Sequence, residues 1–227
     1  MPLHAIVSYD DTRADLDALA LGELLHAAGA WLTLAYVRHA TQGCGEDERL
    51  SQEAAEALLE RGAARVGDER VQRRVVVSAS TGEGLGWLAA HERADLIVFG
   101  SEYRTPRGHV SPGRTAQVLL EGGPVAIALS PAGFAARSHS IGSVALLPGC
   151  EDLAAIDTVP ALADRLGATV VERAHSADLL VAGSRAEASL GQLSISARTA
   201  NAIEQARAPV VVVARGVALW VDRVLAV

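Results

Sequence analysis

The chain spells one pattern twice: ADLIVFGSEYRTPRGHVSPGRTA at residues 94–116 and ADLLVAGSRAEASLGQLSISARTA at residues 177–200. Each copy opens with a run of apolar residues that is typical of a strand buried on both faces of a parallel sheet. A loop of small and polar residues follows, and each copy ends where a helical pattern begins. One strand, loop and helix occurring twice in a single chain indicates an internal repeat.

Strand and helix patterns alternate around the first copy. Strands are predicted at 4–10, 31–39, 71–80, 96–101 and 124–130, and helices at about 13–28, 48–66, 83–93 and 112–120. Five strands that alternate with four helices predict a doubly wound α/β fold with a mostly parallel sheet. In the first helix, either Asp11 or Thr12 is expected to be the N-cap, and the buried face is expected to hold Leu16, Ala20, Leu24 and Ala27.

The second half repeats the first in shortened form. Residues 144–149 and 152–167 resemble the first strand and helix, but the stretch between the first helix and the repeated strand is far shorter than in the first half. One or two β-α units are therefore missing. Residues 169–174 are expected to form an antiparallel edge strand or the remnant of a helix, because too few residues separate them from 178–183 for a return crossover.

The predicted organisation is two α/β domains, at 1–133 and 143–227, with a linker at 134–142. The linker segment is small, polar and without clear periodicity, as domain boundaries commonly are. Half of the 227 residues are hydrophobic but only 4% are aromatic, so the core is built from Ala, Val and Leu.

Charge and composition exclude several functions. A formal charge of −7 argues against polymeric nucleic acid and anionic membranes as partners. All 20 basic residues are Arg, so no lysine is present for a Schiff base or a P-loop. Cys44 and Cys150 form neither a metal spacing nor a disulfide framework. With no readable signal peptide and no run long enough to span a bilayer, we expect a cytoplasmic protein.

The loop between Gly100 and Gly113 is the candidate site. In open parallel sheets, ligands bind beyond the carboxyl ends of the strands. Both glycines let a backbone approach a phosphate, and Arg114 and Thr115 add a cation, a hydroxyl and the free N–H groups of a helix start. Arg104, Arg107 and Arg114 place three cations in this one loop of an acidic chain. Taken alone, these residues fit an anion site and a solvated loop equally well.

These residues resemble the universal stress proteins, in a tandem form with two fused domains. The family pattern is a strand ending in Gly, two residues, Gly, nine residues, Gly, and then Ser or Thr. Gly100 and Gly113 match the first and third glycines, Tyr103 takes the place of the second, and Arg114 stands where Ser or Thr is expected, with Thr115 next. The resemblance covers nearly all of residues 3–131 and, more loosely, 142–219.

The resemblance implies a Rossmann-like sheet of strand order 3-2-1-4-5 and a stress-response regulator that binds an adenine nucleotide such as ATP, ADP or AMP. Asp10 would face adenine or ribose and Val37 would line the adenine pocket. The phosphates would lie at Gly100, Ser101, Gly113, Arg114 and Thr115. The resemblance also implies that the fifth strands of the two halves pair as an internal pseudo-dimer, with a homodimer left open.

The second copy lacks most of this pattern. Gly183 survives, while Ala186 takes the second glycine position and Ser196 or Ala197 the third. We expect this half to bind no nucleotide.

Two alternatives of other classes remain. One is a nucleotide-free interaction protein in which Tyr103 fills the phosphate space. The other is a nucleotide-cleaving enzyme with a metal held by Asp10 and Asp11. The direction of the Tyr103 side chain separates the first alternative from nucleotide binding. No catalytic base and no metal site can be assigned from the sequence.

Overall fold

The structure is a computed structural model that describes residues 2–39, 52–137 and 140–221. The first half contains β1 (His4–Ser8), α1 (Arg13–Ala27), β2 (Trp31–His39), α2 (Gln52–Val66), β3 (Gln72–Ser78), α3 (Thr81–Glu92), β4 (Leu96–Phe99), α4 (Arg114–Leu120) and β5 (Ala126–Leu129). The second contains the short 3-10 helix η2 (Phe134–Ala136), β6 (Ser143–Leu146), α5 (Leu153–Leu166), β7 (Thr169–Val170), the 3-10 helix η3 (Ala174–Ser176), β8 (Leu179–Gly183), α6 (Ala197–Gln205) and β9 (Val210–Val213). The predicted start of α2 at residue 48, like Cys44, lies outside the described residues.

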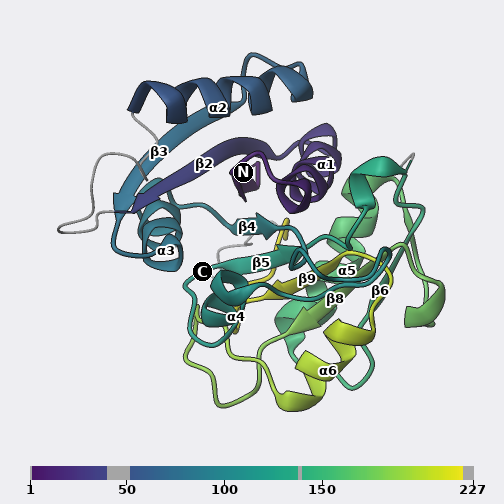
Figure 1. Ribbon diagram of the computed structural model, residues 1–227. Helices are drawn as coiled ribbons and strands as arrows, with labels where there is room; N and C mark the ends of the chain where they lie inside the picture. Colours follow the sequence, from purple (N-terminus) through teal and green to yellow (C-terminus); the bar gives the residue numbers. More distant parts are fainter. Residues whose placement is uncertain (1, 40–51, 138–139, 222–227) are drawn as a thin grey trace.

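Within the described residues, nine strands form one sheet, in the order β3-β2-β1-β4-β5-β9-β8-β6-β7 (Figure 1). The first five strands are parallel and have the expected order 3-2-1-4-5. The two halves meet at β5 and β9, which pair antiparallel with Ile127 opposite Val212. The two strands that follow a proline therefore pair with each other, as the family resemblance implied.

Helices cover both faces of the sheet and bury a core on each. Leucines of α1, α2 and α5 pack on one face, and leucines and isoleucines of α3, α4 and α6 pack on the other. The strands between them are almost wholly apolar, as expected of a parallel sheet covered on both sides. Among the described residues, no helix is long and apolar enough to cross a bilayer.

The buried face of α1 differs from the prediction. Ala18, Leu21 and Leu25 are buried against the sheet, whereas Ala27 is exposed and the other predicted positions are only partly buried. The helix is apolar on most sides, so its sequence does not single out one face. The tertiary contact selects the face that holds Gly22, where an added Cβ would lie 2.7 Å from Val7 Cγ2.

The prediction for residues 169–174 was wrong in its direction. β7 is a parallel edge strand, with Thr169 opposite Ser143 and Val170 opposite Val144. It is only two residues long, and η3 then takes the chain past β6 to β8 on the other side. Residues 171–178 reach about 26 Å when extended, which is enough to cross β6 and return over so short a strand.

The segment predicted as a linker is fastened to the first half. Phe134 is buried, and the buried carboxylate of Asp17 in α1 accepts backbone hydrogen bonds from Gly133 and Ala135, both at 2.7 Å. Nothing in the sequence singled out Asp17, because an acidic residue within a helix usually faces solvent. The domain limits themselves stay a prediction.

Candidate functional site

The predicted site residues come from neighbouring strand ends. β1 lies between β2 and β4 in the sheet, and all three run parallel. Asp10 follows β1, Val37 lies near the end of β2, and Gly100 directly follows β4. The structure therefore brings these three residues to one edge. Residues 40–51, which follow β2 at this edge, lie outside the described part of the chain.

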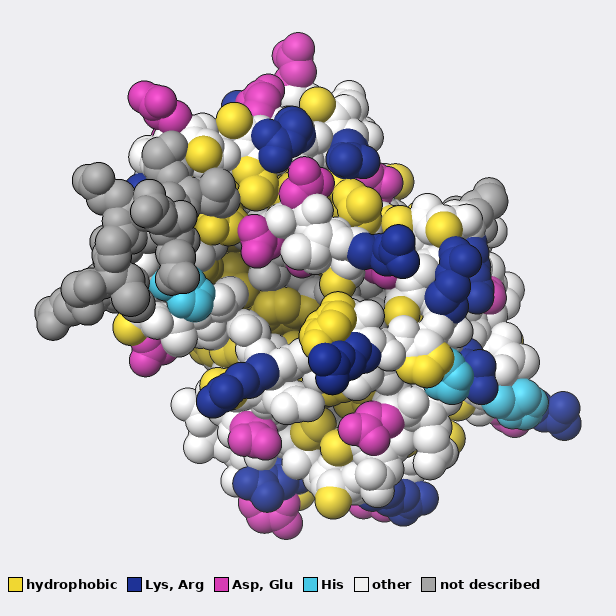
Figure 2. Space-filling view, viewed as in Figure 1, with side chains coloured by type: hydrophobic (Ala, Val, Ile, Leu, Met, Phe, Trp, Pro, Cys, Tyr) yellow, Lys and Arg dark blue, Asp and Glu magenta, His cyan; other side chains and the backbone are white. Residues whose placement is uncertain are grey.

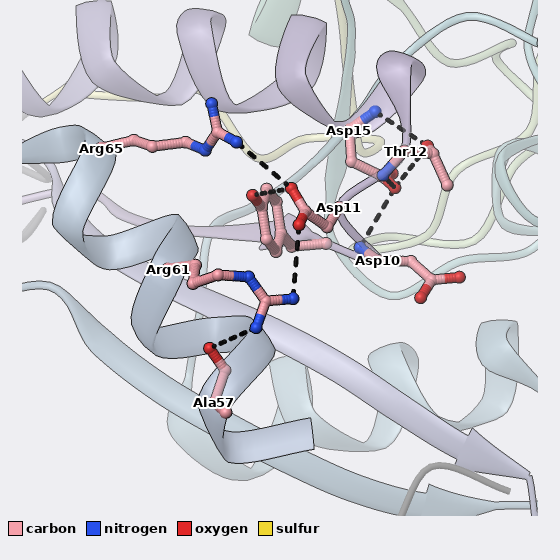
Figure 3. A network of polar contacts seen from close by, with 8 residues as sticks. Asp10, Asp11, Thr12, Asp15, Ala57, Arg61 and Arg65 are labelled. Carbon is pink, nitrogen blue, oxygen red and sulfur yellow. Dashed lines mark hydrogen bonds and ion pairs between the residues drawn. The ribbon is translucent and has the colours of Figure 1, made fainter. Parts of the chain in front are cut away.

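The turn after β1 is ordered by a capping box. Thr12 is the N-cap of α1, and its hydroxyl both accepts from the Asp15 N–H and donates to Asp15 Oδ2 at 2.6 Å. The same carboxylate oxygen accepts the backbone N–H groups of Asp10 and Thr12, each at 3.1 Å (Figure 3). Burial raises the pKa of Asp15, although these hydrogen bonds oppose the rise. The Thr-x-x-Asp spacing is a sequence signal for such a cap.

Asp10 presents its carboxylate away from this turn. In Figure 3 the Asp10 side chain points away from Asp11 and Asp15, and the residue is exposed. Desolvation, followed by the carboxylates of Asp15 and Asp11, raises the pKa of Asp10, while His39 lowers it. Within the described residues, the Asp10 carboxylate has no hydrogen-bond partner.

Asp11, unlike Asp10, is held by contacts within the protein. It adopts a left-handed backbone conformation (φ 54°), and its carboxylate accepts a hydrogen bond from the Tyr9 hydroxyl at 2.8 Å. Arg61 and Arg65 of α2 approach the same carboxylate at 3.4 and 3.7 Å. Asp11 therefore connects the β1 turn to α2 and does not share a ligand point with Asp10. No group of three or more metal-ligating side chains occurs in the described part of the chain.

The two loop glycines have different surroundings: Gly100 is tightly packed, whereas Gly113 lies beside open space. A Cβ placed on Gly100 would lie 2.5 Å from the carbonyl carbon of Ala14 and closer still to its oxygen. Gly100 is therefore required for α1 to approach β4, whatever the ligand. A Cβ on Gly113 would meet nothing within 4 Å, and its backbone (φ −67°, ψ 168°) suits any residue. The fold itself does not need a glycine at Gly113.

Ser101 holds the loop together. Its side chain is buried, and its hydroxyl donates to the Ser130 carbonyl at 2.7 Å and accepts from the Ser111 N–H at 3.1 Å. The hydroxyl is therefore engaged within the protein, and contact of Ser101 with a phosphate stays a prediction. The Ser101 hydroxyl therefore joins the loop at Ser111 to the segment after β5 at Ser130.

The same serine arrangement recurs in the second copy. Ser184 bonds to partners 8, 10 and 29 residues along the chain, the same separations as for Ser101. When Ser184 is aligned with Ser101, the position equivalent to Gly113 is Ser196 rather than Ala197. Ser196 is the N-cap of α6 and accepts from the Thr199 N–H at 3.1 Å, whereas Gly113 gives α4 no side-chain cap.

Side chains close the strand ends of the second copy. The buried Asp152 carboxylate accepts the Ser184 N–H at 3.1 Å and pairs with Arg215 at 3.3 Å. An added Cβ on Gly183 would lie 3.0 Å from Asp152 Cγ, so this glycine is also kept for packing. The Arg198 guanidinium lies against Gly149, 2.7 Å from the position of a Cβ there.

Tyr103 does not fill the site. Its side chain is 78% exposed, and the Arg104 guanidinium lies 5.0 Å from the ring centre. Because the Tyr103 side chain points outward, it does not occupy the space expected for phosphates. Arg114 is also exposed, and Thr115 lies beside Gly82 at the start of α3, where a Cβ would be 3.8 Å from Thr115 Cγ2.

The first turn of α3 connects this part of the site to β2. A Cβ on Gly84 would lie 2.9 Å from Val37 Cγ1, so α3 packs directly on Val37. His39 Nε2 and Thr81 Oγ1 lie 3.0 Å apart at the same place. Val37 and Thr115 therefore both lie near the first turn of α3.

No protein-family model and no curated protein sequence matches the chain. Solved structures do match. A Pseudomonas aeruginosa UCBPP-PA14 protein assigned to the universal stress proteins has a TM-score of 0.65 at 14% identity, covering 92% of each chain. A universal stress protein from Archaeoglobus fulgidus DSM 4304 has a TM-score of 0.60 at 14% identity, covering 94% of this chain and 98% of that one. A universal stress protein in complex with cAMP covers 43% of this chain and 75% of its own at 23% identity, with a TM-score of 0.35. The two long matches show that the chain has the fold of the universal stress proteins over nearly its whole length.

Proposed function

We propose that the first half binds an adenine nucleotide at the joint edge of β1, β2 and β4, and that the protein acts as a stress-response regulator without catalysis of its own. The observation that carries this proposal is the contrast between Gly113 and Ser196. The fold needs no glycine at Gly113, yet the loop has one there and leaves the space beside it open. The second copy has a serine in that place that caps its helix.

The roles in the proposed site are those that the family resemblance implies, and the positions of the side chains support them. The unpartnered Asp10 carboxylate would accept ribose hydroxyls, and Val37 would form an apolar wall beside adenine. Arg114 and Thr115, with the open backbone at Gly113, would face the phosphates. α4 has only seven residues, so its dipole contributes little and the arginine must supply most of the charge.

The first test is to denature the purified protein, identify any released nucleotide by mass, and then titrate ATP, ADP, AMP and cAMP into the ligand-free chain by calorimetry. We expect about one site per chain, lost in Asp10→Ala and Gly113→Val. Gly122→Val is the matched control, because Gly122 also has open space around it and lies outside the proposed site.

Ser196→Gly tests the asymmetry. Removing the cap leaves Asp152, Arg215 and Arg198 in place, so we expect no second site to appear. If no nucleotide binds at millimolar concentration while the protein stays folded, the proposal fails and the nucleotide-free interaction protein takes its place.

A further inference from the structure

A cavity of about 660 Å³ lies in the second half, away from the proposed nucleotide site. Its apolar wall includes Leu147, Leu180 and Ala206, which belong to the core on the α6 face of the sheet. Gly108 and Pro131 complete it from the first half. Both halves therefore build this cavity.

The cavity follows from the shortening of the second copy. In the first half, α3 directly precedes the strand ADLIVFG and buries Leu85 and Leu88 on this face of the sheet. In the second half, the three-residue η3 occupies the corresponding place before ADLLVAG. A single turn covers much less of the sheet than a helix of three turns. The hollow lies where the missing helix would have packed.

Cations line the rim of this cavity. Arg137, Arg173 and Arg207 all contribute to its lining, and no ion pair engages any of them within the described residues. Arg137 reaches over Gly108, where a Cβ would lie 3.2 Å from Nη2. In Figure 2, arginines (dark blue) and histidines (cyan) gather at the right-hand edge, where Figure 1 shows the β6 end of the sheet.

The acidic residues nearby only partly offset this charge. Asp178 Oδ2 already accepts hydrogen bonds from the Gly142 N–H at 3.1 Å and the Ser143 hydroxyl at 2.8 Å. Glu172 is exposed, and His175 adds a further basic group. The cavity lining therefore has three arginines but only two carboxylates, those of Glu172 and Asp178.

We propose that this cavity binds a small anionic molecule with an apolar body, its anion held by Arg137, Arg173 and Arg207 and its body against Leu147 and Leu180. The volume lies within the range of small-molecule sites. A protein partner would need a surface of about 800 Å², far more than this cavity offers. Arginine side chains suit both phosphate and carboxylate groups.

The test uses three probes with the same aromatic body: 1-naphthyl phosphate, 1-naphthoate and neutral 1-naphthol, titrated into the full chain while backbone amide NMR signals are followed. We expect the anionic probes to bind with a Kd on the order of 1 mM or tighter and to shift signals of Ala177, Leu180 and Ala206. Naphthol should bind at least about tenfold more weakly. Tighter binding of the phosphate than of the carboxylate would identify a phosphate ester as the ligand class, and equal binding would identify organic anions in general.

Two variants test the site. Replacing Arg137, Arg173 and Arg207 together by Gln should weaken the anionic probes at least about tenfold. The matched control, which makes the same charge change at exposed arginines away from the cavity, replaces Arg13, Arg165 and Arg185 and should leave binding within about twofold. Ala202→Phe, at a partly buried α6 position that lines the cavity, should fill it and abolish the shifts.

Three results would overturn the proposal: naphthol binding as tightly as the anions, an equal loss in both triple variants, or shifts confined to residues outside the cavity. Because the probes lack adenine and the variants spare Asp10 and Gly113, these results are independent of the nucleotide proposal.

Discussion

Replacing Gly100 by Ala should destabilise the protein strongly, even with no ligand present. The added Cβ would lie 2.5 Å from the Ala14 carbonyl carbon and 2.9 Å from its Cα, and all the opposing atoms belong to the backbone of α1. No side chain can rotate away, so the helix must move from the sheet. Overpacking of this kind costs about 1–3 kcal/mol, and a backbone shift places the cost near 3 kcal/mol. For a chain of this length, that corresponds to a fall in Tm of roughly 6–12 °C.

Gly113→Ala is the comparison. Its backbone already suits alanine and the space around it is open, so a small gain in chain entropy and a small loss of capping nearly cancel. We expect a change within about 0.5 kcal/mol, measured by urea unfolding of the nucleotide-free protein and followed by circular dichroism. If Gly100→Ala and Gly113→Ala changed the free energy of unfolding by the same amount, the distinction between a glycine needed for packing and a glycine beside open space would be refuted.

Three further changes test other contacts. Asp17→Asn should lower the free energy of unfolding by about 2 kcal/mol, because the buried carboxylate accepts two short backbone hydrogen bonds and an amide can accept only with its one oxygen; no change in the urea midpoint would argue against this anchor. Burial, and then the hydrogen bond to Asp11, raise the pKa of Tyr9 to about 12 from 10.0, so the folded state holds this proton more tightly than the unfolded chain does. The resulting stability is complete below pH 10 and is lost as the pH rises through about 12, by roughly 2 kcal/mol in urea unfolding, and Tyr9→Phe should lack this loss. Asp152→Ala should cost about 2 kcal/mol, because it leaves the buried Ser184 N–H unpaired; an unchanged thermal midpoint would contradict the closed second copy.

Much of the fold could be predicted because its signals are local. Apolar runs, glycine-ended helices and prolines before strands each lie within a few residues, and together they indicated the alternation of strands and helices. The strand order and the pairing of β5 with β9 came from the family resemblance. The face of α1 and the direction of β7 were missed. In both places the deciding contact, Gly22 on Val7 or Thr169 beside Ser143, is with a distant segment.

The candidate site was harder to predict for a related reason. Sequence alone treats Gly100 and Gly113 alike, since both fit the same motif. Only the neighbouring atoms reveal that one serves packing and the other has open space. The engagement of Asp11 by Arg61 joins residues 50 positions apart, and no spacing rule anticipates it. Thr12, by contrast, was one of the two N-caps expected from the sequence, and the structure confirms it.

The antiparallel junction of β5 and β9 has a consequence for symmetry. Where two identical chains meet at such a junction, every substitution occurs on both sides of the two-fold axis, so the two sites gain or lose residues together. Here one polypeptide supplies both sides. A serine can therefore cap the helix in one half while a glycine leaves the other half open, and neither choice is imposed on its counterpart. A single polypeptide can therefore carry different residues at corresponding positions on the two sides of the β5–β9 junction.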